Sequence, residues 1–303
     1  MAVSGTVPTE LGDKKIRDLL MQYAVPAIIA MTASSLYNMV DSIFIGHIKD
    51  VGSYAISGLA VTFPLMNIST ALGTLVGVGA STILSMLLGQ RNYQAANKVI
   101  INEVMLNVII GTLYTVITLV FLDPILMFFG ASANTLPYAR DYMVIILIGN
   151  VITHLYFGLN NIIRASGNPK LAMALTIFTV VSNTILDPIF IFWLDMGIKG
   201  AALATVICQL LALVYTVRYF LSGKNYLRLP RRMSEYRLDW RIAKDSLTIG
   251  MGPFLMNSAA CIVTMFINQQ LSKYGGDLAI GAYGIVNRFT FLFIMVNMGL
   301  NQG

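Results

Sequence analysis

Charged residues are few in this sequence. Only 11% of the 303 residues are charged and 56% are hydrophobic, whereas soluble domains average about 25% charged residues. The apolar residues come in runs of about 20 or more, the length that crosses about 30 Å of hydrocarbon. This composition excludes a soluble protein and predicts that lipid surrounds most of the chain.

Cysteine is rarer still. Cys208 and Cys261 are the only two cysteines, and both lie in apolar runs, which excludes a disulfide framework and a cysteine metal site. The net charge of +6 comes without a soluble basic face with interleaved aromatic residues, so we expect no nucleic-acid partner. No paired nucleophile and base occurs at helical spacing, so we expect neither an enzyme nor a cofactor.

Long apolar runs make up most of the chain. All should be helices, because a helix satisfies its own backbone hydrogen bonds in lipid. We therefore predict an all-α integral membrane protein with eight transmembrane helices. The runs cover residues 17–47, 52–89, 93–122, 136–165, 169–194, 198–222, 242–273 and 278 to the end.

The basic residues in the connections predict the orientation. With a cytoplasmic N-terminus, 15 Lys and Arg residues lie inside and four outside, with Arg288 left in the eighth run. Such a bias is typical of cytoplasmic loops. The four outer residues are Lys49, Arg140, Lys199 and Lys273; the inner ones are Lys14, Lys15, Arg17, Arg91, Lys98, Arg164, Lys170, Arg218, Lys224, Arg228, Arg231, Arg232, Arg237, Arg241 and Lys244.

A weak internal repeat divides the chain. Pro26 matches Pro253 at an offset of 227 residues, and Asn268 then stands opposite Asp41. Transporters are often built from such repeats. We predict a six-helix N-terminal lobe at 1–222, a cytoplasmic linker at 223–241, and the first two helices of an incomplete second lobe at 242–303. On this interpretation the sequence is truncated in its eighth helix.

Two aspartates lie where hydrocarbon is expected. Asp41 falls in the first run and Asp187 in the fifth. A charged Asp at bilayer depth costs about 2.5–3.5 kcal/mol on insertion scales, so it should face the bundle interior or a wet cavity. Ion and proton pathways use such groups. A neutral, hydrogen-bonded aspartic acid that only holds helices together is the alternative.

The fifth run offers further oxygen ligands. Asn183 precedes Asp187 by four residues, so both project from one helical face. Pro188 removes the hydrogen bond to the carbonyl of Thr184 and should kink the helix. These oxygens suit Na⁺, and the carboxylate also suits a proton. The alternative is a kink filled by a Ser or Thr hydroxyl.

Three weaker candidates also lie in apolar runs. Arg288 could line a central cavity, although pairing with a carboxylate or snorkelling explains it equally well. Glu103 follows an interface-like helix start. His154 is more simply an interhelical hydrogen-bonding residue than a proton relay.

Several motifs in order resemble one family. Residues 37–46 read Tyr-Asn-Met-Val-Asp-Ser-Ile-Phe-Ile-Gly, 163–170 read Ile-Arg-Ala-Ser-Gly-Asn-Pro-Lys, 197–205 read Gly-Ile-Lys-Gly-Ala-Ala-Leu-Ala-Thr and 301–303 read Asn-Gln-Gly. They resemble the first helix, the turn between helices 4 and 5, the start of helix 6 and the helix 8 motif of prokaryotic multidrug and toxic compound extrusion (MATE) transporters.

The resemblance implies a twelve-helix, two-lobe fold in a bacterial inner membrane. It implies export of organic cations or drugs by antiport with Na⁺ or H⁺, by a protein that we expect to be monomeric when complete. A lipid-linked saccharide flippase of the related superfamily is the alternative, although it should carry more cationic cavity residues. The implied cation site, where Na⁺ could bind, consists of Asp41, Asn183, Asp187 and Thr205. Further candidates for lining the cavity are Tyr37, Asn38 and Arg288.

The charge count makes a testable prediction about topology. In a background without native cysteines, a cysteine at position 49 or 199 should react with an impermeant maleimide in intact cells, and one at position 231 should not. Labelling lysed cells controls for accessibility. The opposite pattern would reverse the predicted orientation.

Overall fold

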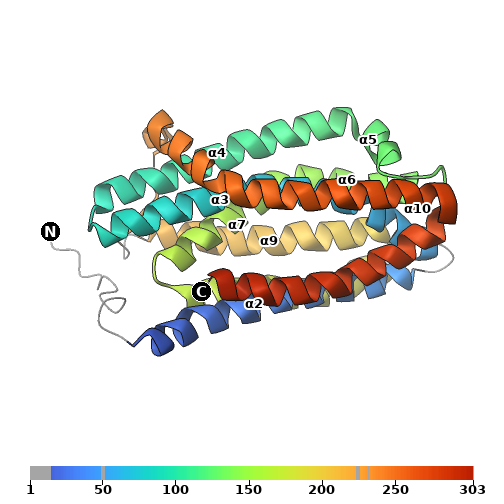
Figure 1. Cartoon of the computed structure of the whole chain (residues 1–303), viewed down its shortest axis with the longest axis horizontal. Coiled ribbons are helices and arrows are strands. Elements are labelled where there is room, and N and C mark those ends of the chain that lie inside the picture. Colours follow the sequence, from blue (N-terminus) through green and yellow to red (C-terminus); the bar gives the residue numbers. More distant parts are fainter. Residues whose placement is uncertain (1–14, 49–51, 223–225, 231, 303) are drawn as a thin grey trace.

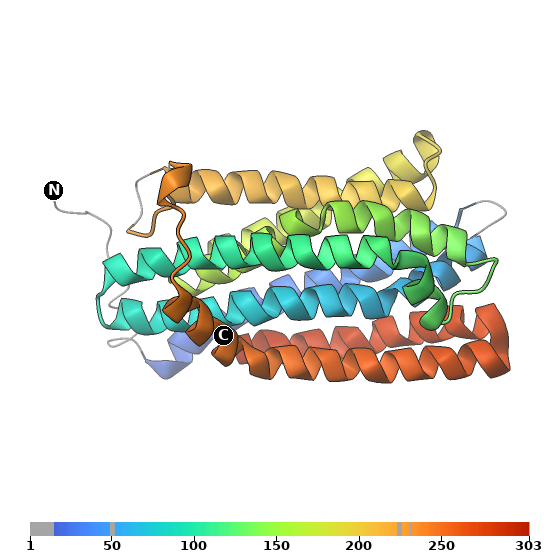
Figure 2. The ribbon, with the colours of Figure 1, turned by 90° about the horizontal axis from the view of Figure 1, so that it is seen from above.

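The computed structural model describes residues 15–48, 52–222, 226–230 and 232–302. Every regular element within these ranges is a helix, and the long helices run side by side along one axis (Figures 1 and 2). The predicted all-α membrane class is confirmed. Five residues used in the sequence predictions lie outside the described ranges: Lys14, Lys49, Lys224, Arg231 and Gly303.

The helices follow the predicted runs closely at most of their ends. In chain order they are α2 (Ile16–Gly46), α3 (Gly52–Gly89), α4 (Tyr93–Val120), α5 (Leu122–Phe128), α6 (Leu136–Ile148), α7 (Asn150–Ala165), α8 (Pro169–Pro188), the π-helix η1 (Ile189–Trp193), α9 (Ile198–Leu221), the 3₁₀-helix η2 (Met233–Glu235) and α10 (Trp240–Gln302).

The predicted count of eight separate spans is not reproduced. Within the described residues, six helices are long and apolar enough to cross a membrane, or seven if α6 and α7, bent by 56°, form one span. The last two predicted runs form the two arms of α10, the first arm before Gly276 and the second after it, and the chain turns back on itself between them (Figures 1 and 2). Only Gly276 leaves helical geometry there, with φ 67° and ψ −168°, a conformation that glycine adopts easily.

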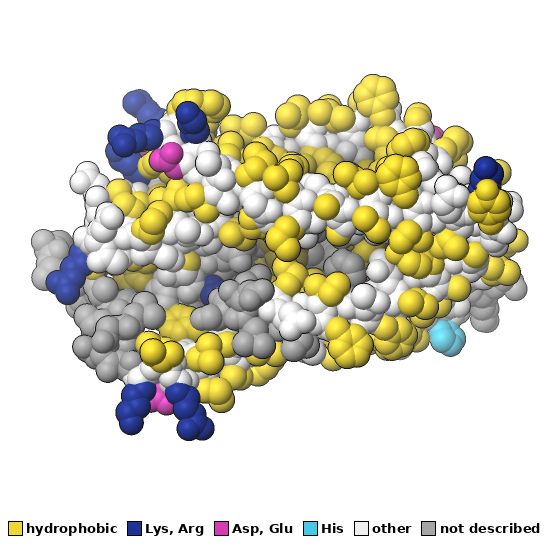
Figure 3. Space-filling model, viewed as in Figure 1, with side chains coloured by type: hydrophobic (Ala, Val, Ile, Leu, Met, Phe, Trp, Pro, Cys, Tyr) yellow, Lys and Arg dark blue, Asp and Glu magenta, His cyan; other side chains and the backbone are white. Residues whose placement is uncertain are grey.

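Apolar side chains both fill the bundle and cover it. One buried cluster includes Ile45, Leu126 and Leu147, and another includes Leu84 and Ile163. Figure 3 shows further hydrophobic side chains along the outer face, whereas Lys and Arg gather mainly at the end where α2 begins. An apolar exterior with basic residues at one end is typical of a multi-pass membrane protein.

The predicted linker is docked onto the bundle in its described part. Leu227 and Leu229 are 2% and 6% exposed and belong to the same buried cluster as Leu84. Asn97 on α4 accepts a hydrogen bond from the backbone N–H of Arg228 at 2.7 Å and donates to the carbonyl of Tyr226 at 3.4 Å. The polar composition of this segment therefore does not make it a free connection.

The α10 hairpin packs along α3 and α2 (Figure 2). Two glycines lie where the first arm of α10 approaches α3 most closely. A Cβ on Gly79 would lie 1.9 Å from the carbonyl oxygen of Ser246, and a Cβ on Gly250 would lie 1.8 Å from that of Leu75. Small residues allow helix backbones in membranes to approach this closely.

This contact predicts the effect of two alanine substitutions. Gly79→Ala and Gly250→Ala should each lower the free energy of unfolding by about 1–3 kcal/mol, because the added methyl group forces the backbones apart. Thermal unfolding in detergent measures the effect. Gly252→Ala is the matched control, since nothing lies within 4 Å of its Cβ position. Equal melting temperatures in all three variants would contradict the close contact.

Candidate functional site

A threonine hydroxyl joins three helices. Oγ1 of Thr205 on α9 lies 2.7 Å from the hydroxyl of Tyr37 on α2 and accepts a hydrogen bond from Nδ2 of Asn183 on α8 at 3.3 Å. It also donates to the carbonyl of Ala201 at 3.1 Å. A hydroxyl has one proton and two lone pairs, so Tyr37 must be the donor and Thr205 is fully bonded. Thr205 therefore orients Tyr37 and Asn183.

Two carboxyl groups lie beside this network. Asp41 on α2, Asn183 and Asp187 are 4%, 2% and 0% exposed. Oδ1 of Asp41, Oδ1 of Asn183 and both carboxyl oxygens of Asp187 have no hydrogen-bond partner among the described residues. The two aspartates also interact electrostatically with each other. Since an unpaired buried polar group costs about 1–3 kcal/mol, these four oxygens require a ligand or a proton.

The local sequence explains how α8 and α9 bring these groups together. Asn183 and Asp187 are one helical turn apart, and at Pro188 the α-helix gives way to the π-helix η1. A Cβ on Gly200 would lie 2.7 Å from the carbonyl of Phe190 in η1, so only glycine lets the start of α9 rest there. At the predicted kink the helix changes from α to π, a feature that is frequent at functional sites.

Two further residues interact with the carboxyl groups. Arg288, on the second arm of α10, interacts electrostatically with Asp41 and with Tyr142 of α6. Its Nη1 is buried without a hydrogen-bond partner in the part of the chain that the structure describes. Tyr142 is 2% exposed and interacts electrostatically with both aspartates. Sequence reasoning missed Tyr142, since no motif marks it.

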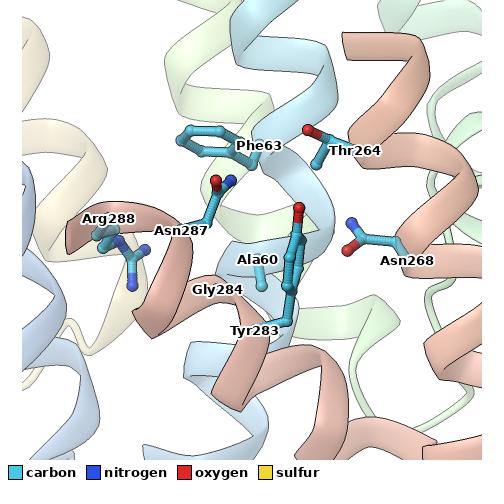
Figure 4. A pocket seen from close by; sticks show the side chains of 8 residues that line it. All are labelled: Ala60, Phe63, Thr264, Asn268, Tyr283, Gly284, Asn287 and Arg288. Atoms are coloured by element: carbon cyan, nitrogen blue, oxygen red, sulfur yellow. The ribbon is translucent and has the colours of Figure 1, made fainter. Parts of the chain in front are cut away.

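Arg288 also lines a small pocket between α3 and the two arms of α10 (Figure 4). Figure 4 shows its side chain pointing away from Thr264 and Asn268, which belong to the first arm. Asn268 is 1% exposed and neither of its amide atoms has a partner among the described residues. The lining residues are Ala60, Phe63, Thr264, Asn268, Tyr283, Gly284, Asn287 and Arg288.

The structure gathers six of the seven predicted site residues and leaves one apart. Asn38 is exposed, and its Nδ2 donates to the carbonyl of Ser34 on its own helix at 3.0 Å. It lies neither in the hydrogen-bond network of Thr205 nor among the residues lining the pocket of Figure 4. A role for Asn38 in a substrate cavity stays a prediction. The six that belong to the network or interact with its carboxyl groups are Tyr37, Asp41, Asn183, Asp187, Thr205 and Arg288.

The donor set fits a hard monovalent cation or a proton. No cluster of three or more His, Cys, Asp or Glu side chains suited to a metal ion occurs within the described ranges. The unpaired atoms at the site are instead oxygens of two carboxyl groups and one amide, which are ligands of hard cations. Thr205 could join them only by giving up one of its hydrogen bonds.

Known proteins resemble this chain over almost its whole length. Multidrug export protein MepA of Staphylococcus haemolyticus (strain JCSC1435) is 32% identical over 291 residues, which are 96% of this chain and 63% of that protein. MepA of Staphylococcus aureus (strain MSSA476) is 30% identical over 284 residues, 94% of this chain and 62% of that one. This chain therefore spans less than two thirds of the length of these relatives.

The fold also resembles that of known multidrug transporters. A solved structure of the MATE multidrug transporter DinF-BH, in complex with a ligand, superposes with a TM-score of 0.90 at 35% identity, covering 98% of this chain and 66% of that one. The family model MatE matches residues 26–189, more than half of the chain, including Asp41, Asn183 and Asp187. The chain belongs to the MatE family.

Proposed function

We propose that this protein is a secondary active efflux transporter that exports organic cations or drugs by antiport with Na⁺ or H⁺. The observation that carries the proposal is the set of four unpaired oxygens of Asp41, Asn183 and Asp187, buried between α2 and α8. The relatives named as multidrug export proteins and transporters support the substrate class. The protein works in the bacterial plasma membrane with its N-terminus in the cytoplasm.

The site takes up the coupling ion. Two carboxylates that share a low-dielectric cavity resist being ionised together. Na⁺ therefore binds with one of Asp41 and Asp187 protonated, or the pair alternates between protonated and deprotonated states as a carrier of H⁺. Asn183 supplies a neutral oxygen ligand in the first case. Thr205 acts by holding Asn183 in place.

Binding of the coupling ion favours a second conformation of the transporter, in which α10 is held less tightly to α2. Arg288 interacts electrostatically with Asp41, so a proton or Na⁺ on Asp41 weakens the attraction between α2 and the second arm of α10. A ligand shifts a conformational equilibrium only by its different affinity for the two states. Competition between the coupling ion and Arg288 for Asp41 provides such a difference.

The residues lining the pocket do not favour the alternative of a lipid-linked saccharide flippase. A pyrophosphate headgroup needs several charge-assisted hydrogen bonds, usually from Arg. Arg288 is the one cationic residue among the eight that line the pocket between α3 and α10. Phe63 and Tyr283 are aromatic, and aromatic faces attract organic cations.

Replacing either carboxylate tests the coupling site. Asp41→Asn and Asp187→Asn should each abolish efflux of a fluorescent organic cation from proteoliposomes under an imposed Na⁺ or H⁺ gradient. The amide keeps the side-chain shape, so membrane yield should stay nearly the same. It cannot carry a negative charge or bind and release a proton. Asp245→Asn, at an exposed position of α10, is the control. Wild-type rates in both site variants under either gradient would refute the shared site.

Substitutions of Thr205 test whether Na⁺ or H⁺ is the coupling ion. If Na⁺ is the ion, Thr205→Ala should raise the Na⁺ concentration for half-maximal thermal stabilisation about tenfold, or ~1.4 kcal/mol, because Asn183 loses its partner. Thr205→Ser keeps the hydroxyl and should behave like wild type. If H⁺ is the ion, Thr205→Ala should leave proton-driven efflux nearly unchanged. A large loss of proton-driven efflux in the Ala variant but not in the Ser variant would contradict a role of Thr205 in Na⁺ binding alone.

A further inference from the structure

A third buried carboxyl group, that of Glu103, lies on α4, away from the site on α2 and α8. Glu103 and Asn107 are one turn apart on α4, and both are 0% exposed. Nδ2 of Asn107 donates a hydrogen bond to Oε1 of Glu103. The other two atoms of the pair, Oε2 of Glu103 and Oδ1 of Asn107, are buried and have no partner among the described residues.

A single proton would satisfy both atoms. A carboxylic acid and a primary amide can form a cyclic pair, in which the amide N–H donates to one carboxyl oxygen and the acid O–H donates to the amide oxygen. Here the first of these two bonds is present, and the two unpaired atoms are those that the second would join. An ionised Glu103 would instead leave a buried charge with one amide donor, which costs several kcal/mol.

The neighbouring helices enclose the pair tightly. A Cβ on Gly158 of α7 would lie 1.7 Å from Oε1 of Glu103 and 2.6 Å from Nδ2 of Asn107. A Cβ on Gly77 of α3 would lie 3.4 Å from Cα of Gly158. Gly158 thus brings α7 directly against the carboxyl group, and Gly77 lets α3 pack closely against α7 beside it. The space on this side suits a proton and excludes a hydrated ion.

His154 of α7 lies at the same interface, the seam where α3, α4 and α7 meet. It also has a buried atom without a partner among the described residues. Ser69 donates to Oδ1 of Asn150 at 2.5 Å, and Nδ2 of Asn150 donates to the carbonyl of Gly111 at 3.3 Å, which fixes the amide orientation. Ser69 has no second proton, so Nε2 of His154 must donate to it across their 3.0 Å contact. Nδ1 of the ring is buried and has no partner in the described part of the chain, so it is the ring position open to a proton.

We propose that Glu103, paired with Asn107, is a proton-binding site in the seam between α3, α4 and α7, separate from the site of Asp41 and Asp187. His154 is a second protonatable group in this seam, on the helical turn of α7 before Gly158. The inference does not depend on the proposed transport function, because it rests on unpaired atoms of different helices.

The titratable groups of the packed elements are few. The whole of α3 is described and has no charged residue. On α7 they are His154, Tyr156 and Arg164, and near the start of α10 they are Asp239, Arg241, Lys244 and Asp245. Asp239 contacts α4 through its backbone N–H, which donates to Oδ1 of Asn102 at 2.8 Å. Arg241, Lys244 and Asp245 are exposed. Since none of these basic groups forms a described ion pair with Glu103, a proton neutralises its carboxyl group instead.

Infrared difference spectroscopy tests the proposal directly. The full chain is placed in lipid nanodiscs with Asp41→Asn and Asp187→Asn as the background, so that the other buried carboxyl groups do not contribute. At neutral pH this protein should show the carbonyl band of a protonated carboxylic acid. Glu103→Gln should lose the band and keep its melting temperature, because a glutamine forms the same cyclic pair with Asn107. The band should disappear in one step as the pH is raised.

Two results would overturn the proposal. Identical spectra from the background protein and from its Glu103→Gln variant would mean that Glu103 is ionised. A band that persists at every pH at which the protein stays folded would mean a permanently neutral side chain that exchanges no proton. Should Glu103→Gln fail to fold, Asn107→Leu removes both amide atoms and should shift the acid band to higher frequency. An unshifted band would contradict the pairing with Asn107.

Discussion

Hydrocarbon offers no hydrogen bonds, and this constraint decides where polar atoms can lie in the bundle. Backbone groups are satisfied within the helices, and many Ser and Thr hydroxyls donate to a carbonyl of their own helix, as Thr184 does to Val180 at 2.9 Å. The remaining polar side chains gather between helices. Thr205 is fully bonded there, whereas Asp41, Asp187 and Glu103 keep oxygens that nothing in the described chain pairs. Such oxygens can take up a proton or a cation.

Glycine determines how closely the helices approach these polar groups. Gly158 lets α7 contact Glu103, and Gly200 lets α9 rest on the π-helix that follows Asp187. In both places a methyl group would overlap the opposing atoms, so the buried polar groups depend on residues that carry no chemistry themselves. The absence of a side chain at Gly79 and Gly250 likewise lets α10 pack closely against α3. Packing and site geometry are therefore set by the same kind of residue.

Much of this architecture could be predicted from the sequence. Hydrophobic runs predict the helices and most of their ends, and four-residue spacing places Asn183 and Asp187 on one face. Spacing within a helix says nothing about which helices meet. The grouping of Asp41, Asn183, Asp187 and Thr205 came from the family resemblance. The hydrogen bond between Tyr37 and Thr205 and the approach of Tyr142 to the aspartates were not predicted.

The misjudged features depend on local geometry that composition does not record. The bend between α6 and α7 changes how the spans are counted, because hydropathy detects apolar length and not backbone direction. The break between the last two predicted runs falls at the turn of α10, where Gly276 leaves helical geometry. The predicted cytoplasmic linker at 223–241 has two buried leucines, Leu227 and Leu229, in its described part, and its polar composition gave no sign of this packing. Glu103 and Asn107 are one turn apart in the sequence. Their significance appears only when burial shows that a single proton would satisfy both.

The charges around Asp41 limit how many ions the site can take in this conformation. Two ionised carboxylates would need two positive charges, and a single Na⁺ or H⁺ supplies one. Arg288 interacts electrostatically with Asp41 and can supply the other, so one monovalent cation then neutralises the group. If α10 moves and withdraws Arg288, the same carboxylates require a second cation or proton. The number of coupling ions bound at Asp41 and Asp187 is thus linked to the position of α10, and this linkage is what an antiporter needs.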